Sequence, residues 1–485
     1  MEEPRRTPVR QSSNGWLGES SEAQLHLPIE IRDPIHGFIK FSSIETNVIN
    51  TRAFQRLRRI RQLALASLVY PGALHTRFEH SLGVMHLAGR LYDQVMRHRS
   101  DSEELRAVRL AALLHDIGHG PFSHVSESVL KRHSKKAKER ASRTEEIHEA
   151  LTCDLIEQCD ELSSLLDRTT MKLVIDLLSG RCGDKTLTGI ITGPLDADKL
   201  DYLLRDSYYC GVKYGVYDLD RLVSTYTRPN DDGDAGIAIS RDGVHSLEQF
   251  IMAKYYMTTQ VYRHRLRLIT DSMIIRGLSL GISEDRIEFL QQLYSYDGSK
   301  EHLDVWVKWD DESLVHEICT RWEKTLACEI FTRLRERRLF KQIYNEKLNI
   351  LEDPVLRDRL SGEFETYRDT LEEKVGDLLG TDPRFVIAHL YSIQSIRELS
   401  GREEGNVLVD QANDGHPVPF HQKSTLFGPI DAAQKEQYLD FYAPVEYKDE
   451  IDKRKRLSEY RDQINSIVTG VLNSNSIGGV DANES

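Results

Sequence analysis

Apolar positions recur at helical spacing along most of this chain. Segments 51–65 and 77–97 carry an apolar residue every three or four positions, which predicts an amphipathic helix over each. Segment 110–114 is apolar on every side and predicts a helix that is buried all round. Segment 245–280 predicts one long helix or a pair of helices. The fold class is therefore predicted to be mainly α.

Shorter apolar runs predict a minority of strands. A strand and a turn are expected within residues 31–37, where proline and glycine interrupt the chain. Further strands are expected at 237–240, 385–393 and 439–447, with helices from 283 to 379 and a closing helix over 455–472. The chain is thus predicted to divide into a disordered tail at 1–28, a helical domain at 29–282, a smaller α+β C-terminal lobe at 283–472 and a disordered end at 473–485.

Composition narrows the class of protein. The 485 residues are enough to bury a sizeable core, and 39% hydrophobic with 29% charged residues is typical of a soluble globular protein. A net charge of −13 argues against a nucleic-acid coat, so nucleic acid is not an expected partner. No segment has the pattern of a signal peptide or a membrane span. The six cysteines form no CxxC pair, which favours a reducing compartment and predicts a cytoplasmic protein.

The stretch 110–124, LAALLHDIGHGPFSH, concentrates the candidate chemistry. Its buried helix runs directly into His115 and Asp116, and a carboxylate there is costly unless it is paired or binds a cation. Glycines and a proline in the next positions predict a turn, which places His119 and His124 on the loop beyond it. By itself, such a His-Asp pair is more often hydrogen-bonded than a metal ligand, so the other segments decide between the two.

Segment 194–211, PLDADKLDYLLRDSYYCG, predicts a second informative helix. At about 100° per residue, Asp198, Tyr202 and Asp206 lie on one face, and Lys199 lies at its edge. Leucines occupy the opposite side and would pack inward. Carboxylates, an ammonium and a phenol on one face suit a phosphorylated ligand that bears hydroxyl groups. An ordinary amphipathic helix is the alternative.

Residues from three separate segments form a candidate metal site. Two imidazoles and two carboxylates without a thiolate suit a catalytic divalent ion such as Mn, Fe, Mg, Ni or Zn. These residues are His80, His115, Asp116 and Asp198. Such an ion would lower the pKa of bound water and screen phosphate charge. A lone histidine on a helix, as His80 would otherwise be, is more often a core residue.

Two basic segments leave alternatives open. The first helix expected here carries Arg56, Arg58, Arg59 and Arg61, which form either a solvated face or an anion-binding surface. The run 131–143, KRHSKKAKERASR, is either a solvated, mobile segment or a lid or electrostatic funnel for a phosphorylated ligand.

Four sequence blocks occur in one order: RLRRIRQL, YPGALHTRFEHSLGV, HDIGHGPFSH and DADKLDYLLRD. This order, with its H…HD…D pattern, resembles the HD superfamily of metal-dependent phosphohydrolases. It is most similar to the deoxynucleoside triphosphate triphosphohydrolases of the sterile-alpha-motif/HD-domain type and their bacterial relatives, over about residues 30–275. The resemblance implies a helical HD-domain core and a C-terminal lobe for oligomerisation and regulation. No sterile-alpha-motif domain is expected, because the N-terminal tail is short and polar.

The resemblance also implies roles for individual residues. The metal ligands would be His80, His115, Asp116 and Asp198. Phosphate-binding positions match Arg77, Lys199 and Tyr202. Positions that hold the sugar 3′-hydroxyl match Gln62 and Asp206. Positions that crowd the 2′ carbon and disfavour ribonucleotides match Leu63 and Tyr262.

The general acid is expected at His124. Glu127 follows it by three residues, one helical neighbour spacing, so its carboxylate can orient and charge the imidazole. In the similar enzymes the matching pair acts on the leaving 5′-oxygen, although the family has Asp where this chain has Glu127. His119 and His148 match additional active-site histidines. The resemblance implies that metal-activated water attacks the α-phosphorus and releases deoxynucleoside and inorganic triphosphate.

Regulation by nucleotides is a further implication. Larger members of the family form oligomers and bind nucleotides between subunits, which implies a homo-oligomer, dimer or tetramer, that is activated by deoxynucleoside triphosphates. Gln55 and Arg58 match such allosteric contacts, but Asn50 stands where an Asp reads guanine, which puts a guanine-specific activator in doubt. The alternatives are another HD-type nucleotide phosphatase, a single-strand nuclease or a nucleotide-sensing scaffold. The biological role would be nucleotide-pool balance or defence against phage.

Overall fold

The structure is a computed structural model that describes residues 25–97, 101–141, 146–229, 236–351, 353–393, 407–410, 417–427 and 436–474. Most of these residues are helical, and their strands form small sheets, so the mainly α prediction is confirmed. The disordered tails predicted at 1–28 and 473–485 lie almost entirely outside the described residues. Within the part of the chain that is described, no helix is both long and apolar enough to cross a membrane.

The first part of the chain forms a hairpin and the helices around it. Strands β1 (Ile29–Asp33) and β2 (Gly37–Phe41) pair antiparallel, with Asp33 opposite Gly37. The helical elements that follow are α1 (Ser43–Ile49), α2 (Arg52–Gln55), the 3-10 turns η2 (Arg56–Arg59) and η3 (Ala66–Leu68), α3 (Arg77–Val95), α4 (Ser102–Leu114), α5 (His124–His133) and α6 (Lys135–Ala141).

The middle of the chain completes the helical core. Its elements are α7 (Ile147–Gln158), α8 (Asp160–Ser163), α9 (Arg168–Leu178), α10 (Lys185–Ile191), α11 (Ala197–Cys210), α12 (Leu219–Ser224), β3 (Tyr226–Thr227), β4 (Ala238–Ser240), η4 (Arg241–Gly243), α13 (Val244–Tyr256), the π-helical η5 (Met257–Tyr262) and α14 (Arg265–Ser283). Helix α3 packs against both α4 and α11, so these helices form the centre of this part.

The last part combines helices with two sheets. Its elements are α15 (Glu288–Leu293), α16 (Lys300–Trp306), α17 (Asp311–Arg321), α18 (Leu326–Arg335), β5 (Lys341–Lys347), η6 (Leu348–Ile350), α19 (Pro354–Leu379), η7 (Pro383–Phe385), β6 (Ile387–Ile393), β7 (Leu408–Asp410), β8 (Val418–Pro419), η8 (Phe420–Gln422), β9 (Glu436–Ala443) and α21 (Glu450–Ser474). One sheet has the order β5-β9-β6, and a second has the order β3-β4-β7-β8.

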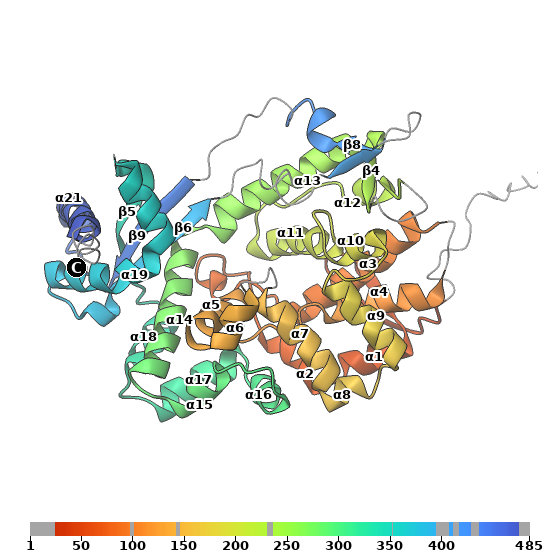
Figure 1. Cartoon of the computed structure of the whole chain (residues 1–485), viewed down its shortest axis with the longest axis horizontal. Helices are drawn as coiled ribbons and strands as arrows, with labels where there is room; N and C mark the ends of the chain where they lie inside the picture. Colours follow the sequence, from red (N-terminus) through yellow and green to blue (C-terminus); the bar gives the residue numbers. More distant parts are fainter. Residues whose placement is uncertain are drawn as a thin grey trace, which may run out of the picture.

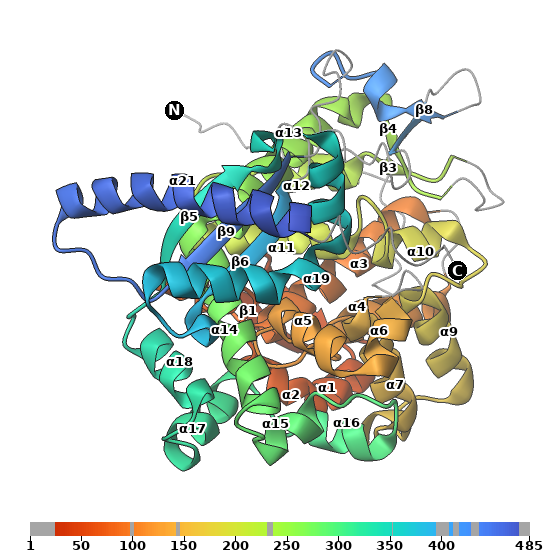
Figure 2. The ribbon, with the colours of Figure 1, turned by 60° about the vertical axis from the view of Figure 1, so that its left-hand side comes forward.

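Two hydrophobic cores divide the molecule. The larger core is built mainly from residues between Ile39 and Phe340, including helices α15 to α18. The smaller core begins at Ile343 and lies between the β5-β9-β6 sheet and helices α19 and α21. Figure 1 shows these elements as a separate group at the left, and Figure 2 shows α21 lying across the strands. The predicted domain limits at 282 and 283 stay a prediction.

Local chemistry explains where the central helices begin and end. The backbone N–H of Thr76 donates to Glu79 Oε1 at 2.8 Å, which caps the start of α3. Helix α11 is capped by Asp196, whose Oδ1 accepts the N–H of Lys199 at 2.9 Å. It ends at Gly211, which has φ +70° in the left-handed region that glycine adopts without strain. Both helices therefore have fixed N-terminal turns, where the candidate ligands lie.

Several predicted elements differ from those observed. The helix expected over 51–65 is shorter: α2 passes into the 3-10 turn η2, and the following residues are irregular. The helices expected without interruption to 379 are wrong at Lys341–Lys347, which is the strand β5. Within the basic run 131–143, the described residues belong to α5 and α6, while residues 142–145 lie outside the described part.

Candidate active site

Three helices bring the four predicted metal ligands to one point. His80 lies in the first turn of α3, and His115 and Asp116 directly follow α4. Asp198 lies in the first turn of α11, beside its cap Asp196. We refer to His80, His115, Asp116 and Asp198 as the metal-ligand group.

The ligand atoms of the metal-ligand group face one another. His80 Nε2 lies 3.0 Å from Asp198 Oδ1 and 3.6 Å from Asp116 Oδ2. His115 Nε2 lies 3.2 Å from Asp116 Oδ1 and 3.8 Å from Asp198 Oδ1. Atoms that each lie about 2.0–2.2 Å from one ion are roughly 3 Å from one another. These separations therefore suit a shared divalent ion.

The hydrogen bonds of the two imidazoles leave the same nitrogen available on each ring. His80 Nδ1 donates to Asp201 Oδ2 at 2.8 Å, and His115 Nδ1 donates to the carbonyl of Ala112 at 2.8 Å. Both Nε2 atoms are buried and have no hydrogen-bond partner among the described residues. A neutral imidazole that donates through Nδ1 presents a lone pair at Nε2, which is the arrangement of a metal ligand. The donor set thus fits a divalent metal ion.

The charges around these ligands also favour a cation. Burial opposes protonation of His80, but the carboxylates of Asp198 and Asp201 raise its pKa to about 10, so a cation bound among these ligands would take the place of the proton on Nε2. Burial likewise opposes ionisation of Asp116, yet Arg77 and the neighbouring histidines hold its pKa well below the usual range. The carboxylates are therefore charged and the centre of the group attracts positive charge.

Asp201 supports the metal-ligand group through the ring nitrogen of His80 that faces away from the other ligands, and the sequence analysis missed it. Its side chain is fully buried; one oxygen accepts from His80 and the other lies 2.6 Å from His36 Nε2. Arg205, one helical turn later, donates to both of its oxygens and also to Asp33. The signal that could have found it was the Asp-Arg spacing of four residues on α11.

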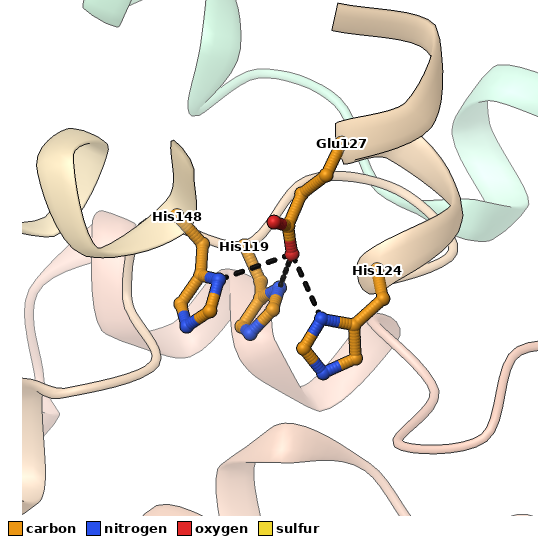
Figure 3. A group of neighbouring side chains, drawn as sticks. All are labelled: His119, His124, Glu127 and His148. Carbon is orange, nitrogen blue, oxygen red and sulfur yellow. Dashed lines mark hydrogen bonds and ion pairs between the residues drawn. The ribbon is translucent and has the colours of Figure 1, made fainter. Parts of the chain in front are cut away.

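A second cluster lies beside the first. Three imidazoles surround Glu127 Oε1: the Nδ1 atoms of His124, His148 and His119 lie at 2.8, 3.0 and 3.6 Å (Figure 3). The rings of His119 and His148 stack at 3.9 Å. We refer to these four residues as the Glu127 group. The structure brings the predicted His124–Glu127 pair together with the two additional histidines, His119 and His148.

Electrostatics distinguish the members of the Glu127 group. Burial opposes ionisation of Glu127, but His148 and His124 hold its pKa far below the usual range. Burial would lower the pKa of His148, but Glu127 raises it. Burial and Arg77 lower the pKa of His119, so this ring is neutral. His124 is 59% exposed and is the member that solvent or a ligand reaches.

A strained turn places His124 at the start of α5. Phe122 and Ser123 have φ of 64° and 57°, in the left-handed region that is uncommon for residues other than glycine. The N–H of Phe122 donates to Asp311 Oδ1 at 2.7 Å, and Arg77 Nε donates to Ser123 Oγ at 2.7 Å. These bonds hold the turn, and so fix the direction in which the first residue of α5 projects.

A cavity of about 260 Å³ opens between the two groups. Among the predicted site residues, those that line it are Gln62, Arg77, His115, Asp116, His119, His124, His148, Asp198, Lys199 and Tyr202. Arg77 Nη1 lies 2.5 Å from Asp116 Oδ2, and Lys199 Nζ lies 2.6 Å from Asp196 Oδ2. The volume of the cavity is just below the roughly 300–1,000 Å³ of small-molecule pockets. Cations, carboxylates and imidazoles therefore share one small space.

Of the residues predicted to contact the sugar, Gln62 lines this cavity and Asp206 does not. Asp206 is buried and has both oxygens engaged, by Tyr262 Oη at 2.7 Å and by His75 Nε2 at 2.7 Å. Gln62 lines the cavity, and its Oε1 is buried without a hydrogen-bond partner among the described residues. Leu63 and Tyr262 do not line the cavity. Their predicted roles stay predictions.

The predicted allosteric residues lie apart from this cavity. Gln55 Oε1 accepts from Arg58 Nε at 2.9 Å, and Arg58 stacks over Phe78 at 3.5 Å. Arg56 fits neither alternative for the arginine-rich segment. Its guanidinium is buried and donates to the carbonyls of Ile117 and His119, so it braces the turn after α4.

Helices that gather an H…HD…D set around one cation position, beside paired imidazoles, define a metal-dependent phosphohydrolase of the HD type. The comparison with protein families agrees: the HD domain matches residues 77–185, and the HD associated region matches residues 217–460. The chain belongs to this HD-domain phosphohydrolase family, whose cofactor is a metal ion, which confirms the resemblance and the cofactor predicted from the sequence.

Known relatives agree with this assignment. The uncharacterized protein YwfO of Bacillus subtilis is 32% identical over 64% of this chain and 71% of its own length. The deoxynucleoside triphosphate triphosphohydrolase SAMHD1 homolog of Dictyostelium discoideum is 30% identical over 64% of this chain and 59% of its own length. A solved phosphohydrolase of Bacteroides thetaiotaomicron, 25% identical, aligns with a TM-score of 0.68 over 86% of this chain and 99% of that one. The match to the Dictyostelium protein thus leaves much of that protein unmatched.

Proposed function

We propose that this chain is a deoxynucleoside triphosphate triphosphohydrolase. One observation carries the proposal: His115, Asp116 and Asp198 of the metal-ligand group line the same cavity as Arg77, Lys199 and the three histidines of the Glu127 group. A triphosphate needs cations to bind it, and its hydrolysis needs an acid for the leaving group. Relatives such as the Dictyostelium protein, named for this activity, support the proposal.

The residues of this chain divide the work as follows. A divalent ion held by the metal-ligand group would lower the pKa of bound water and neutralise phosphate charge. Arg77 and Lys199 bind the phosphates in the cavity, where burial opposes the charge of Lys199 but Asp196 raises its pKa. His124, oriented by Glu127 through Nδ1, keeps Nε2 to donate a proton to the leaving 5′-oxygen. The products are deoxynucleoside and inorganic triphosphate.

The sugar is bound beside α11. Asp206 accepts the 3′-hydroxyl with Gln62, and the rings of Tyr202 and Tyr262, 6.1 Å apart, lie next to it. In this proposal Leu63 and Tyr262 crowd the 2′ carbon, so a ribonucleotide would meet an apolar wall. This arrangement supports a deoxynucleotide as the proposed substrate.

The proposal extends to regulation. We propose a homo-oligomer with Gln55 and Arg58 at a site for an activating nucleotide, in the cytoplasm. Arg58 is exposed while its guanidinium is already stacked and hydrogen-bonded, so it is oriented to meet a ligand. All six cysteines are free thiols, which suits a reducing compartment.

Product analysis tests the proposed reaction. Purified protein is incubated with each deoxynucleoside triphosphate, alone and in mixtures, with Mn²⁺ or Mg²⁺. Chromatography and phosphate detection are expected to show equal amounts of deoxynucleoside and intact triphosphate. Hydrolysis that appears only in mixtures would support an activating nucleotide.

Other products would contradict the proposal. Deoxynucleoside monophosphate with pyrophosphate, or stepwise release of phosphate, would indicate a different nucleotide phosphatase. Cleavage of single-stranded DNA without hydrolysis of nucleotides would indicate a nuclease. Binding without turnover under any metal would indicate a nucleotide-sensing scaffold.

A further inference from the structure

A second, larger cavity lies behind the active site. It has a volume of about 1030 Å³ and shares no lining residue with the active-site cavity. Its walls are formed by the C-terminal half of α5 and by parts of α6, α14 and α19. These elements lie next to one another in Figure 2. Helix α5 therefore has His124 at one end and this cavity at the other.

The lining of this rear cavity is rich in cations. It includes Lys131, Arg132, Lys138, Arg276, Arg368 and Arg384. The carboxylates that face them are fewer: Glu284, Glu365, Asp369 and Glu372. The whole chain has a net charge of −13, so an excess of positive charge in a concave site is a local feature rather than a reflection of composition.

Most of the carboxylates are already engaged. Glu372 lies 2.5 Å from Arg276 and also accepts the N–H of Ala388 at 3.0 Å. Glu365 and Asp369 both form ion pairs with Arg368. Arg384 is paired with Asp382. Among the described residues, Lys131 and Lys138 form no ion pair, so their charges face the cavity without compensation.

The guanidinium of Arg132 is also undercompensated. Arg132 Nη2 lies 3.9 Å from Oε1 of its carboxylate partner Glu365, and Arg368 pairs with the same carboxylate. Partial burial and the positive charge of Arg368 lower the pKa of Arg132, and Glu365 offsets this only in part. A bound anion would remove this repulsion.

Neutral donors complete the site. The hydroxyls of Ser128, Ser279 and Ser283 line the same walls. Ser279 Oγ and His133 Nε2 are buried and make no hydrogen bond within the described part of the chain. Buried polar atoms without partners are uncommon in folded proteins and mark places where a ligand or water binds.

We propose that the rear cavity binds a polyphosphate anion. Cations on opposite walls of a cavity this wide suit a ligand with several charged groups rather than one small anion. Among the described residues, no Phe, Tyr or Trp lines the cavity, so this lining offers no stacking surface for the bases of a single-stranded nucleic acid. The recognised group is therefore the phosphate chain itself, from inorganic polyphosphate or from a nucleoside triphosphate.

The proposal is tested by calorimetric titration of metal-free protein with inorganic tripolyphosphate. Lys199→Ala serves as the background, because it weakens binding in the active-site cavity and leaves the rear cavity intact. Binding at the rear cavity is expected to remain in this background. Adding Lys131→Glu and Lys138→Glu, both exposed in the structure, is expected to weaken it on the order of tenfold or more. The test needs no catalysis, so its outcome is independent of the proposed reaction.

A matched control carries the same change in charge elsewhere. Lys172→Glu with Lys324→Glu alters two exposed lysines that do not line the cavity. The control is expected to change the affinity less than twofold. Equal weakening by both pairs, or no binding in the Lys199→Ala background, would overturn the proposal. The milder pair Lys131→Gln with Lys138→Gln repeats the test if the charge reversal unfolds the protein.

Further titrations identify the source of the anion. Equal affinities for tripolyphosphate and a nucleoside triphosphate would support recognition of the phosphate chain alone. Tighter binding of the nucleotide, lost in the Lys131→Glu and Lys138→Glu variant, would support a nucleotide as its source. Binding of single-stranded DNA through these lysines without binding of tripolyphosphate would refute the proposal.

Discussion

The metal-ligand group and the Glu127 group use the same kinds of side chain for different purposes. In the metal-ligand group, His80 and His115 donate through Nδ1 to groups outside the cluster and leave Nε2 facing inward. In the Glu127 group, the Nδ1 atoms themselves face inward, toward one carboxylate oxygen. The difference lies in which ring nitrogen is committed, and to what.

This difference separates metal binding from proton transfer. An imidazole with a free Nε2 lone pair among carboxylates is arranged for a cation. In the Glu127 group the inward-facing nitrogen is itself hydrogen-bonded to an ionised carboxylate, and the exposed ring of His124 is thereby arranged to carry a proton. Changing one carboxylate in each group should therefore have separable effects.

The largest effect is expected from Asp116→Asn in the metal-ligand group. The substitution removes a charged ligand, so metal content should fall and hydrolysis should drop at least about a thousandfold, because a metal ion contributes several kcal/mol to the reaction. Metal analysis and steady-state kinetics measure both. Full metal content with normal turnover would show that Asp116 is not a ligand.

Glu127→Gln removes the same charge from the neighbouring group and is the matched comparison. We expect kcat to fall about a hundredfold or more, since His124 loses the carboxylate that orients and charges it. Metal content should remain that of the unmodified protein. Loss of the metal in this variant would mean that the two groups are not functionally distinct.

A smaller effect is expected from Asp201→Asn, which acts through His80. The amide cannot replace the charged acceptor at Nδ1, so metal affinity should fall roughly 10–100-fold. The measurement is the dissociation constant for Mn²⁺. Saturating metal should restore most of the rate, because Asp201 positions a ligand and does not touch the substrate. A rate that excess metal leaves unchanged would contradict this role.

The smallest effect is expected at the turn before His124 and concerns stability alone. Burial raises the pKa of Asp311 to about 7, so the folded protein holds a proton there that the unfolded chain, with a pKa of 3.8, releases. The stability that this proton provides is present at low pH and is lost as the pH rises toward 7.

Urea unfolding at pH 5 and pH 8 measures this effect. Asp311→Asn lacks the titration, so its stability relative to the unmodified protein should increase with pH on the order of 1–3 kcal/mol. Glu312→Gln, at an exposed neighbouring side chain, is the control and should show no such trend. Parallel pH profiles for all proteins would contradict a buried, protonated Asp311.

The candidate ligands follow a local sequence pattern, whereas the residues that support them do not. Spacing on α11 placed Asp198, Tyr202 and Asp206 on one face, because helical periodicity is a local property. The contact of Asp201 with His36 joins residues 165 positions apart, and no local pattern encodes it. The role of Arg56 was missed for the same reason, since its carbonyl partners lie 61 and 63 positions away.

The fold shows the same limit. Helices α3 and α11 begin close to their predicted positions, since their caps lie in the adjacent sequence. Strand β5, KQIYNEK, is mostly polar, and the prediction of helix there is wrong because its strand conformation depends on pairing with β9, about ninety to a hundred positions away. Long-range pairing overrides local propensity at this strand.

The link between Asp201 and His36 has a consequence at the outside of the molecule. The turn of the N-terminal hairpin is anchored by contacts of His36 with Asp201 and of Asp33 with Arg205. In contrast, four of the five residues of β1 are exposed. Ordering of this peripheral strand thus depends on the same carboxylate that orients His80. Protection of the hairpin amides from hydrogen exchange would therefore report whether a metal ion is bound at the metal-ligand group, and this measurement needs no substrate.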